Sequence, residues 1–173
     1  MIKQVALLTC AVLTFSCHAW SQDTEVPRSK VFGIELGSNI STYKNATLLE
    51  DTGSKQGVYA IPKKDFTVPP LFSEGFTFQA LTKSDGTIFG ILVRTNKSTE
   101  NSSKVVDAIV EAYPQVEKDS IGFNDLARGE IGLGYTIIVY RNLFPPTLNV
   151  ACAHRPTALK LEAEEKKKNA KGL

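Results

Sequence analysis

Cys152 and His154 stand two positions apart in the stretch NVACAHRPT, and these residue types are common in nucleophilic catalysis and zinc binding. A catalytic pair needs the sulfur and an imidazole nitrogen within hydrogen-bond reach, with a third group to orient the ring. In a strand, side chains two residues apart stand roughly parallel, about 6 to 7 Å apart at Cα. The spacing therefore favours a structural role. Leu148, Val150 and Cys152 share one strand face, which predicts that Cys152 is a core residue and His154 a residue at the strand end.

Three other patterns could carry chemistry. The stretch GEIGLG (129–134) precedes a predicted strand instead of opening a helix, so it lacks the context of a phosphate-binding loop. Glu50 and Asp51 begin a predicted loop with no third acid or base beside them, and the lysines 166–168 follow the acidic run EAEE. Both patterns are typical of solvated surface. We therefore expect no catalytic residues, no cofactor-binding residues, no metal ligands and no cofactor.

The N-terminus has the three regions of a secretory signal peptide. A single charge at Lys3 precedes the apolar run VALLTCAVLTF, and the small and polar residues SCHAWSQ follow. The run is shorter than the roughly 18 residues that a membrane-spanning helix needs. Cleavage after Ala19 or after Ser21 is expected, with a preference for Ser21. An alternative is lipidation of Cys17, which Ser16 suits but which Thr14 and Phe15 fit poorly.

Cleavage after Ser21 leaves about 150 residues, enough for one domain with a hydrophobic core. Cleavage removes Cys10, Cys17 and His18. The remaining chain then has one cysteine, Cys152, and one histidine, His154, so no internal disulfide can form. Loss of Lys3 lowers the formal net charge from +2 to about +1. This near balance gives no reason to expect a nucleic acid partner.

Four sites match the N-glycosylation pattern, and they begin at Asn39, Asn45, Asn96 and Asn101. In a secreted eukaryotic chain they would mark the surface, whereas in a bacterium they would be ordinary polar loop residues. Both interpretations stay open, and we favour the bacterial one.

A β-hairpin is the clearest element, in FTFQALTKSDGTIFGILVRT. Asp85-Gly86 is typical of a two-residue type I′ turn, in which both residues have positive φ. That turn predicts that Phe78 faces Val93, Ala80 faces Ile91 and Thr82 faces Phe89. The large side chains then share one face of the ribbon.

The remaining elements are weaker. Apolar residues at helical spacing in KVVDAIVEAYP predict an amphipathic helix over 104–113, which we expect to cover the apolar face of the hairpin. Further strands are predicted at 31–37, 58–62, 133–141 and 147–154. A short helix after residue 38 could be capped by Ser38 or Asn39. The C-terminal stretch is rich in helix formers and ends in lysines, so a helix that frays into solvent is expected.

The stretch VFGIELGSNISTY, an apolar strand that ends in glycine before a short helix, resembles the opening of small exported bacterial domains. The outer-membrane assembly lipoproteins and the β-lactamase-inhibitor-like domains are similar in this respect. The resemblance covers about a dozen residues. It implies a short helical start packed on an antiparallel sheet, in a class of periplasmic binding, inhibitory or assembly proteins.

These observations predict a signal peptide (1–21), a flexible leader (22–30), a single α+β domain (31–154) and a C-terminal helical tail (155–173). The domain is expected to contain an antiparallel sheet of about five or six strands and one packed amphipathic helix. The expected function is that of a periplasmic or secreted, non-enzymatic protein that binds a protein partner, such as an inhibitor, an immunity protein or an envelope assembly factor. Membrane association is expected only with lipidation of Cys17. The alternatives are a hydrolase that uses carboxylates and a secreted eukaryotic glycoprotein.

Overall fold

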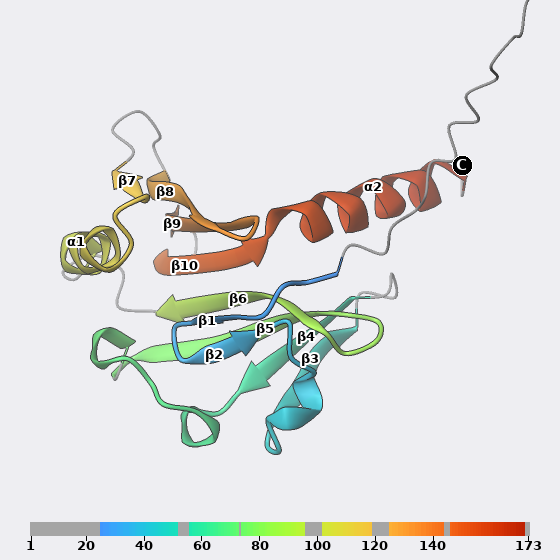
Figure 1. Ribbon diagram of the computed structural model, residues 1–173, viewed down its shortest axis with the longest axis horizontal. Helices are drawn as coiled ribbons and strands as arrows, with labels where there is room; N and C mark the ends of the chain where they lie inside the picture. The colour runs from blue at the N-terminus through green and yellow to red at the C-terminus, as the bar shows by residue number, and fades with distance from the viewer. Residues whose placement is uncertain are drawn as a thin grey trace, which may run out of the picture.

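The computed structural model describes residues 25–51, 56–72, 74–95, 102–118, 125–143 and 146–171 (Figure 1). They form an α+β fold, as predicted, with an eight-stranded antiparallel sheet, a separate two-stranded sheet and two α-helices. The predicted signal peptide, Cys17 and the acceptor sites Asn96 and Asn101 lie outside the described residues.

The sheets contain more strands than the five or six that we predicted. The small sheet pairs β1 (Ser29–Val31) with β2 (Ile34–Leu36). The first four strands of the large sheet are β3 (Thr47–Asp51), β4 (Gln56–Ile61), β5 (Phe76–Lys83) and β6 (Ile88–Thr95). The other four are β7 (Glu117–Lys118), β8 (Asp125–Gly132), β9 (Tyr135–Leu143) and β10 (Pro146–His154).

The large sheet consists of two four-stranded meanders that meet along one central pair. Its strand order is β3-β4-β5-β6-β10-β9-β8-β7, so neighbours in each meander follow one another in the chain. The last strand of each meander, β6 and β10, joins the two halves, with Val93 opposite Val150 and Ile91 opposite Cys152. The helix α1 (Ser102–Ala112) lies in the connection between the meanders. This arrangement places β6 and β10, in which most residues are buried, at the centre of the sheet.

The predicted hairpin is confirmed as β5 and β6, with Phe78 opposite Val93 and Ala80 opposite Ile91. The predicted pair of Thr82 with Phe89 is wrong, because Thr82 faces Ile88. The register shifts by one residue next to this pair, which is the signature of a β-bulge. The bulge restores the register that a two-residue turn would have given, so the apolar side chains farther along still share a face.

The turn of this hairpin is also different from the predicted type I′ turn. Gly86 has φ 81°, but among the described non-glycine residues a positive φ occurs only at Phe32 and Leu133. The amide of Gly86 donates to Lys83 O at 3.0 Å, and the amide of Lys83 donates to Thr87 O at 2.9 Å. The loop therefore has three residues, with glycine in the left-handed position, as in the common type I turn with a bulge.

Pairs of consecutive positive φ values occur instead at Phe32-Gly33 and Leu133-Gly134, in the two-residue connections β1–β2 and β8–β9. We predicted one strand over 31–37, and the structure has a hairpin there. A bulky residue with φ near 50° is strained, by about 1 to 2 kcal/mol. At Phe32 this conformation places the ring in the core, where it is 4% exposed.

Residues 25–30, which we predicted as part of a flexible leader, lie against the domain. Val26 is buried, and the hydroxyl of Tyr135 donates to the carbonyl of Pro27. Pairing in β1 begins at Ser29. The described part of the domain therefore begins before residue 31.

The apolar face of the β5–β6 hairpin is covered by aromatic side chains and by the β1–β2 sheet. The rings of Phe66 and Phe72 pack edge-on against Phe78, with centroids 4.8 and 6.0 Å away. The ring of Phe32 packs against Phe72 at 5.2 Å, and β2 runs beside β6.

Helix α1 is in the predicted place in the sequence, and Val105, Val106 and Ile109 are buried as expected. The prediction that it covers the hairpin is wrong. Its backbone packs closest to β7 and β8, at the far end of the sheet (Figure 1). Tyr113, just after the helix, contacts Phe32 with centroids 6.0 Å apart, so α1 and the hairpin are joined through the β1–β2 turn.

Short 3-10 helices occupy the connections, namely η1 (Ile40–Thr42), η2 (Lys63–Asp65) and η3 (Pro70–Phe72). Asn39 caps η1, as one of the two predicted caps, by accepting from the amide of Ser41 at 3.0 Å. The predicted C-terminal helix is α2 (Arg155–Lys171), which extends beyond the sheet from the end of β10 (Figure 1). Neither described α-helix combines the length and the apolar character that crossing a bilayer would require.

Candidate binding groove

The structure confirms the predicted core position of Cys152. Its side chain is fully buried between β9 and β6, and burial raises the pKa of the thiol to about 12. The group is therefore a neutral thiol at physiological pH and not a nucleophilic thiolate.

His154 ends β10 and is buried at the start of α2. Its Nδ1 lies 2.8 Å from Oγ1 of Thr157, and its ring packs against Tyr135 with centroids 5.3 Å apart. Burial lowers the pKa of the imidazole, which favours the neutral form. The residue joins the first turn of α2 to the β8–β9 turn, where the amide of Arg155 donates to Gly134 O at 2.8 Å.

The other residues singled out in the sequence lie in strands, helices or loop contacts. Glu50 lies in the edge strand β3, and Lys166 pairs with Glu162 on α2 at 2.6 Å. The side-chain amide of Asn39 donates to the carbonyl oxygen of Asp85 at 2.8 Å, and the side-chain amide of Asn45 donates to Asp65 Oδ1 at 2.6 Å. Both asparagine side chains therefore hold loops together.

The two faces of the large sheet differ in what covers them. The inner face carries the core and includes Phe78, Val93, Val150 and Val139. The next position on each strand points to the outer face. Opposed pairs trace one outer row across the sheet, in the order Ala60, Gln79, Leu92, Ala151, Ile138, Arg128 and Glu117. Apolar residues in the middle of this row are only half-buried, so no described element of the chain covers them fully.

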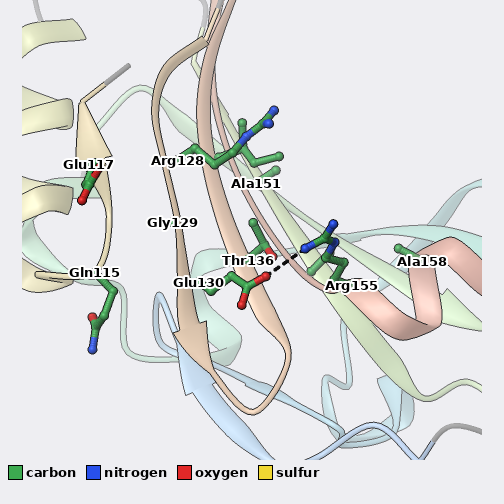
Figure 2. Close-up of a pocket in the computed structure, with 11 residues that line it drawn as sticks. Gln115, Glu117, Arg128, Gly129, Glu130, Thr136, Ala151, Arg155 and Ala158 are labelled. Carbon is green, nitrogen blue, oxygen red and sulfur yellow. Dashed lines mark hydrogen bonds and ion pairs between the residues drawn. The ribbon is translucent and has the colours of Figure 1, made fainter. Parts of the chain in front are cut away.

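A groove of about 600 Å³ lies on this outer face, over β8, β9 and β10 (Figure 2). Its floor is apolar and small, formed by Ile138, Ala151 and Ala153. Arg155 and Ala158 line it from the first turn of α2, and Gln115 and Glu117 line it from the opposite side (Figure 2). The volume is within the range of typical ligand pockets.

Gly129 allows the wall that contains Gln115 and Glu117 to form. A Cβ atom there would lie 2.1 Å from the carbonyl oxygen of Gln115 and 2.5 Å from Cα of Val116. Only glycine lets the segment before β7 lie so close to β8, and this requirement accounts for one glycine of GEIGLG. Val116 is buried, which anchors the segment.

Polar groups form the rim of the groove. Arg155 pairs with Glu130 at 2.9 Å across one end, and both side chains are more than 60% exposed (Figure 2). Arg128 projects from β8 beside Ile138. The Oγ1 atom of Thr136 is buried and has no hydrogen-bond partner within the described part of the chain. Buried hydroxyl groups are normally paired, and this one lacks its usual partner.

Sequence reasoning missed the groove, although one signal for it was present. Ile137 and Ile138 are consecutive apolar residues of one strand, and so are Ala151, Cys152 and Ala153. A strand with one solvated face alternates apolar and polar residues, whereas a strand apolar on both faces needs cover on both. The continuous apolar runs therefore indicated that the outer face of this sheet is not ordinary solvated surface.

The described ranges contain no group of three or more His, Cys, Asp or Glu side chains placed to hold a metal ion. Comparison with protein-family models, with curated proteins and with solved structures finds no match to this chain.

Proposed function

We propose that this protein is an exported, non-enzymatic binding protein that receives a segment of another protein in the groove over β8, β9 and β10. The observation that carries the proposal is the half-buried apolar floor of Ile138, Ala151 and Ala153 between two walls. Surface of this kind marks interaction sites on soluble proteins. Inhibitors, immunity proteins and envelope assembly factors are the classes considered, and the resemblance of VFGIELGSNISTY to small exported bacterial domains supports them.

The groove is suited to a side chain or short segment of a partner. Small alanine side chains on the floor permit close approach, while Arg128, Arg155 and Glu130 offer charged hydrogen bonds at the rim. An apolar centre with a polar rim is the usual anatomy of a protein interface.

Site-specific photo-crosslinking tests this proposal. A benzophenone side chain replaces Ile138 in the groove, and in a matched control it replaces Thr77, which is exposed on the same face of β5. Expression in the native host should give one discrete protein adduct at position 138 and none at 77. Ala151→Arg should abolish capture of the same partner, whereas Thr77→Arg should not. Equal labelling at both positions, or none at either, would contradict the proposal.

Export is tested separately by the intact mass of the secreted protein. The mature N-terminus should be Trp20 or Gln22, because small residues precede both cleavage points. A mass that includes acyl chains on Cys17 would establish a lipoprotein instead.

A hydrolase remains the second candidate, because Glu117 and Glu130 both line the groove. Against it, Glu130 is ion-paired and 65% exposed, whereas catalytic carboxylates are usually desolvated. Ester, phosphate and glycoside substrates can be tested with the purified protein. Turnover that is lost in Glu117→Gln or Glu130→Gln would favour the enzyme and count against the binding protein.

A further inference from the structure

Two bulky residues occupy the same strained position in two different hairpins. Phe32 has φ 50° and precedes Gly33 at 85°, and Leu133 has φ 52° and precedes Gly134 at 76°. Each pair forms the whole connection of a hairpin, β1–β2 in the first case and β8–β9 in the second. Positive φ at both central residues is typical of a type I′ turn, whose first position favours asparagine, aspartate or glycine because a bulky side chain is strained there.

The two turns differ in what offsets this strain. The ring of Phe32 is 4% exposed and packs against Phe72 and Tyr113. Leu133 is 62% exposed and does not belong to the apolar side chains that pack on the described core. A single exposed leucine is ordinary on a protein surface. A strained one that gains no burial within the described structure is not, and unfavourable backbone conformations of this kind cluster at binding and active sites.

Leu133 lies at one end of the binding groove. The carbonyl of its neighbour Gly134 accepts from the amide of Arg155 at 2.8 Å, and Arg155 pairs with Glu130 at 2.9 Å. In Figure 2 the β8–β9 turn lies just beyond this ion pair. A second exposed leucine, Leu159, follows Arg155 by four residues on α2 and so lies on the same face of the helix. Two exposed leucines therefore stand near one charged pair.

We propose that Leu133 is the anchor by which this protein docks into an apolar pocket of its protein partner, and that the partner also covers Leu159. The inference rests on the proposed function, because the partner is the protein whose segment lies in the groove. A two-residue turn holds the leucine in a fixed position, so little conformational freedom is lost when a pocket encloses it. Burial of its side chain in that pocket then offsets the strain that the free protein carries.

The charges beside Leu133 favour a protein pocket over a lipid surface. Binding to a bilayer depends on the apolar area that enters it. Here the ion pair of Glu130 and Arg155 stands next to the turn, and a bilayer that took up both Leu133 and Leu159 would have to accommodate this pair. Protein interfaces combine apolar contacts at the centre with charged groups at the rim.

Leu133→Asn separates binding from folding. Asparagine suits this position of the turn, so the variant should melt about 2 to 4 °C above the wild type. The same variant should lower the yield of partner crosslinked at Ile138 at least tenfold. Leu48→Asn is the matched control, since Leu48 is 52% exposed on β3 without a positive φ, and it should leave the yield unchanged. Unchanged capture by Leu133→Asn would overturn the inference, and so would a lower melting temperature, which would show that Leu133 serves the fold.

A second crosslinking position keeps Leu133 in place. A benzophenone side chain at position 159 should capture the same partner as one at position 138, whereas one at position 48 should capture none. Capture at 138 but not at 159 would overturn this inference and leave the proposed function standing. Capture at neither position would contradict both.

Vesicles test the lipid alternative. The full chain should not sediment with vesicles of phosphatidylglycerol and phosphatidylethanolamine. Sedimentation with the vesicles that Leu133→Asn abolishes and Leu48→Asn does not would assign the leucine to a membrane surface and overturn the protein pocket.

Discussion

The inner and outer faces of the large sheet use neighbouring residues of the same strands for different purposes. On β9, Ile137 points inward and is fully buried, while Ile138 points outward and forms part of the groove floor. On β10, Cys152 is buried between Ala151 and Ala153, which line the groove. A change of one position along a strand therefore separates residues that hold the fold from residues that we propose to bind a partner.

The largest effect expected from this comparison is at β5. Phe78→Ala should destabilise the protein by about 3 to 5 kcal/mol, because it opens a cavity beneath Phe66 and Phe72. Gln79→Ala, on the outer face, should change stability by about 0.5 kcal/mol or less. Urea unfolding measures both, and similar losses for the two variants would show that the faces are not distinct.

A second test uses the buried thiol. Cys152→Ser should cost about 1 to 3 kcal/mol, because it buries a hydroxyl group without a partner, and Cys152→Ala should cost less. Neither change should weaken capture of a partner at Ile138 beyond its effect on folding. Alkylation of the native thiol should be slow, and rapid labelling would place Cys152 outside the core.

A smaller loss of stability is expected at the β5–β6 turn, which fixes the register of the hairpin. Gly86→Val should cost about 1 to 2 kcal/mol, because valine is strained at φ 81° and its Cβ would lie 2.9 Å from the side-chain amide nitrogen of Asn39. Thermal unfolding measures the loss, with Ser84→Val in the same exposed loop as the control. If Gly86→Val is neutral, the turn does not hold the two faces in register.

The smallest effect concerns pH. Burial lowers the pKa of His154, so the unfolded chain binds a proton more readily than the folded one. The contribution of this residue is therefore constant above the unfolded pKa of about 6.5 and is lost as the pH falls from there through the folded pKa. Wild-type protein should lose more stability than His154→Gln between pH 7 and 5. Equal pH profiles would mean that the imidazole is solvated.

Local signals predicted the central elements well. The alternation around Phe78, Ala80, Ile91 and Val93 and the preference of Gly86 for positive φ identified the hairpin, because these are properties of adjacent residues. The stripe of Val105, Val106 and Ile109 identified α1 for the same reason. Strands β3 and β8 were missed, since TLLED and DLARGEIG have no clean alternation and bulges interrupt the register of both strands.

The Phe32 turn was missed for a different reason. Isolated bulky residues avoid positive φ, so VFGIELG favours a strand by local propensity. In the folded protein, the contacts of the Phe32 ring with Phe72 and Tyr113 offset the strain. The groove was not predictable either, because Gln115, Ile138 and Arg155 come from distant parts of the sequence.

By itself, the sequence determined the α+β class, the β5–β6 pairing, the place of α1 in the chain and the core position of Cys152. Each of these follows from side-chain spacing within one or two neighbouring elements, where the periodicity of strand or helix decides which residues share a face. Only the tertiary structure decided that β10 inserts beside β6, that α1 packs on β7 and β8, and that the outer face carries a groove. Such arrangements depend on the total burial achieved by segments far apart in the chain, and no local pattern encodes that sum.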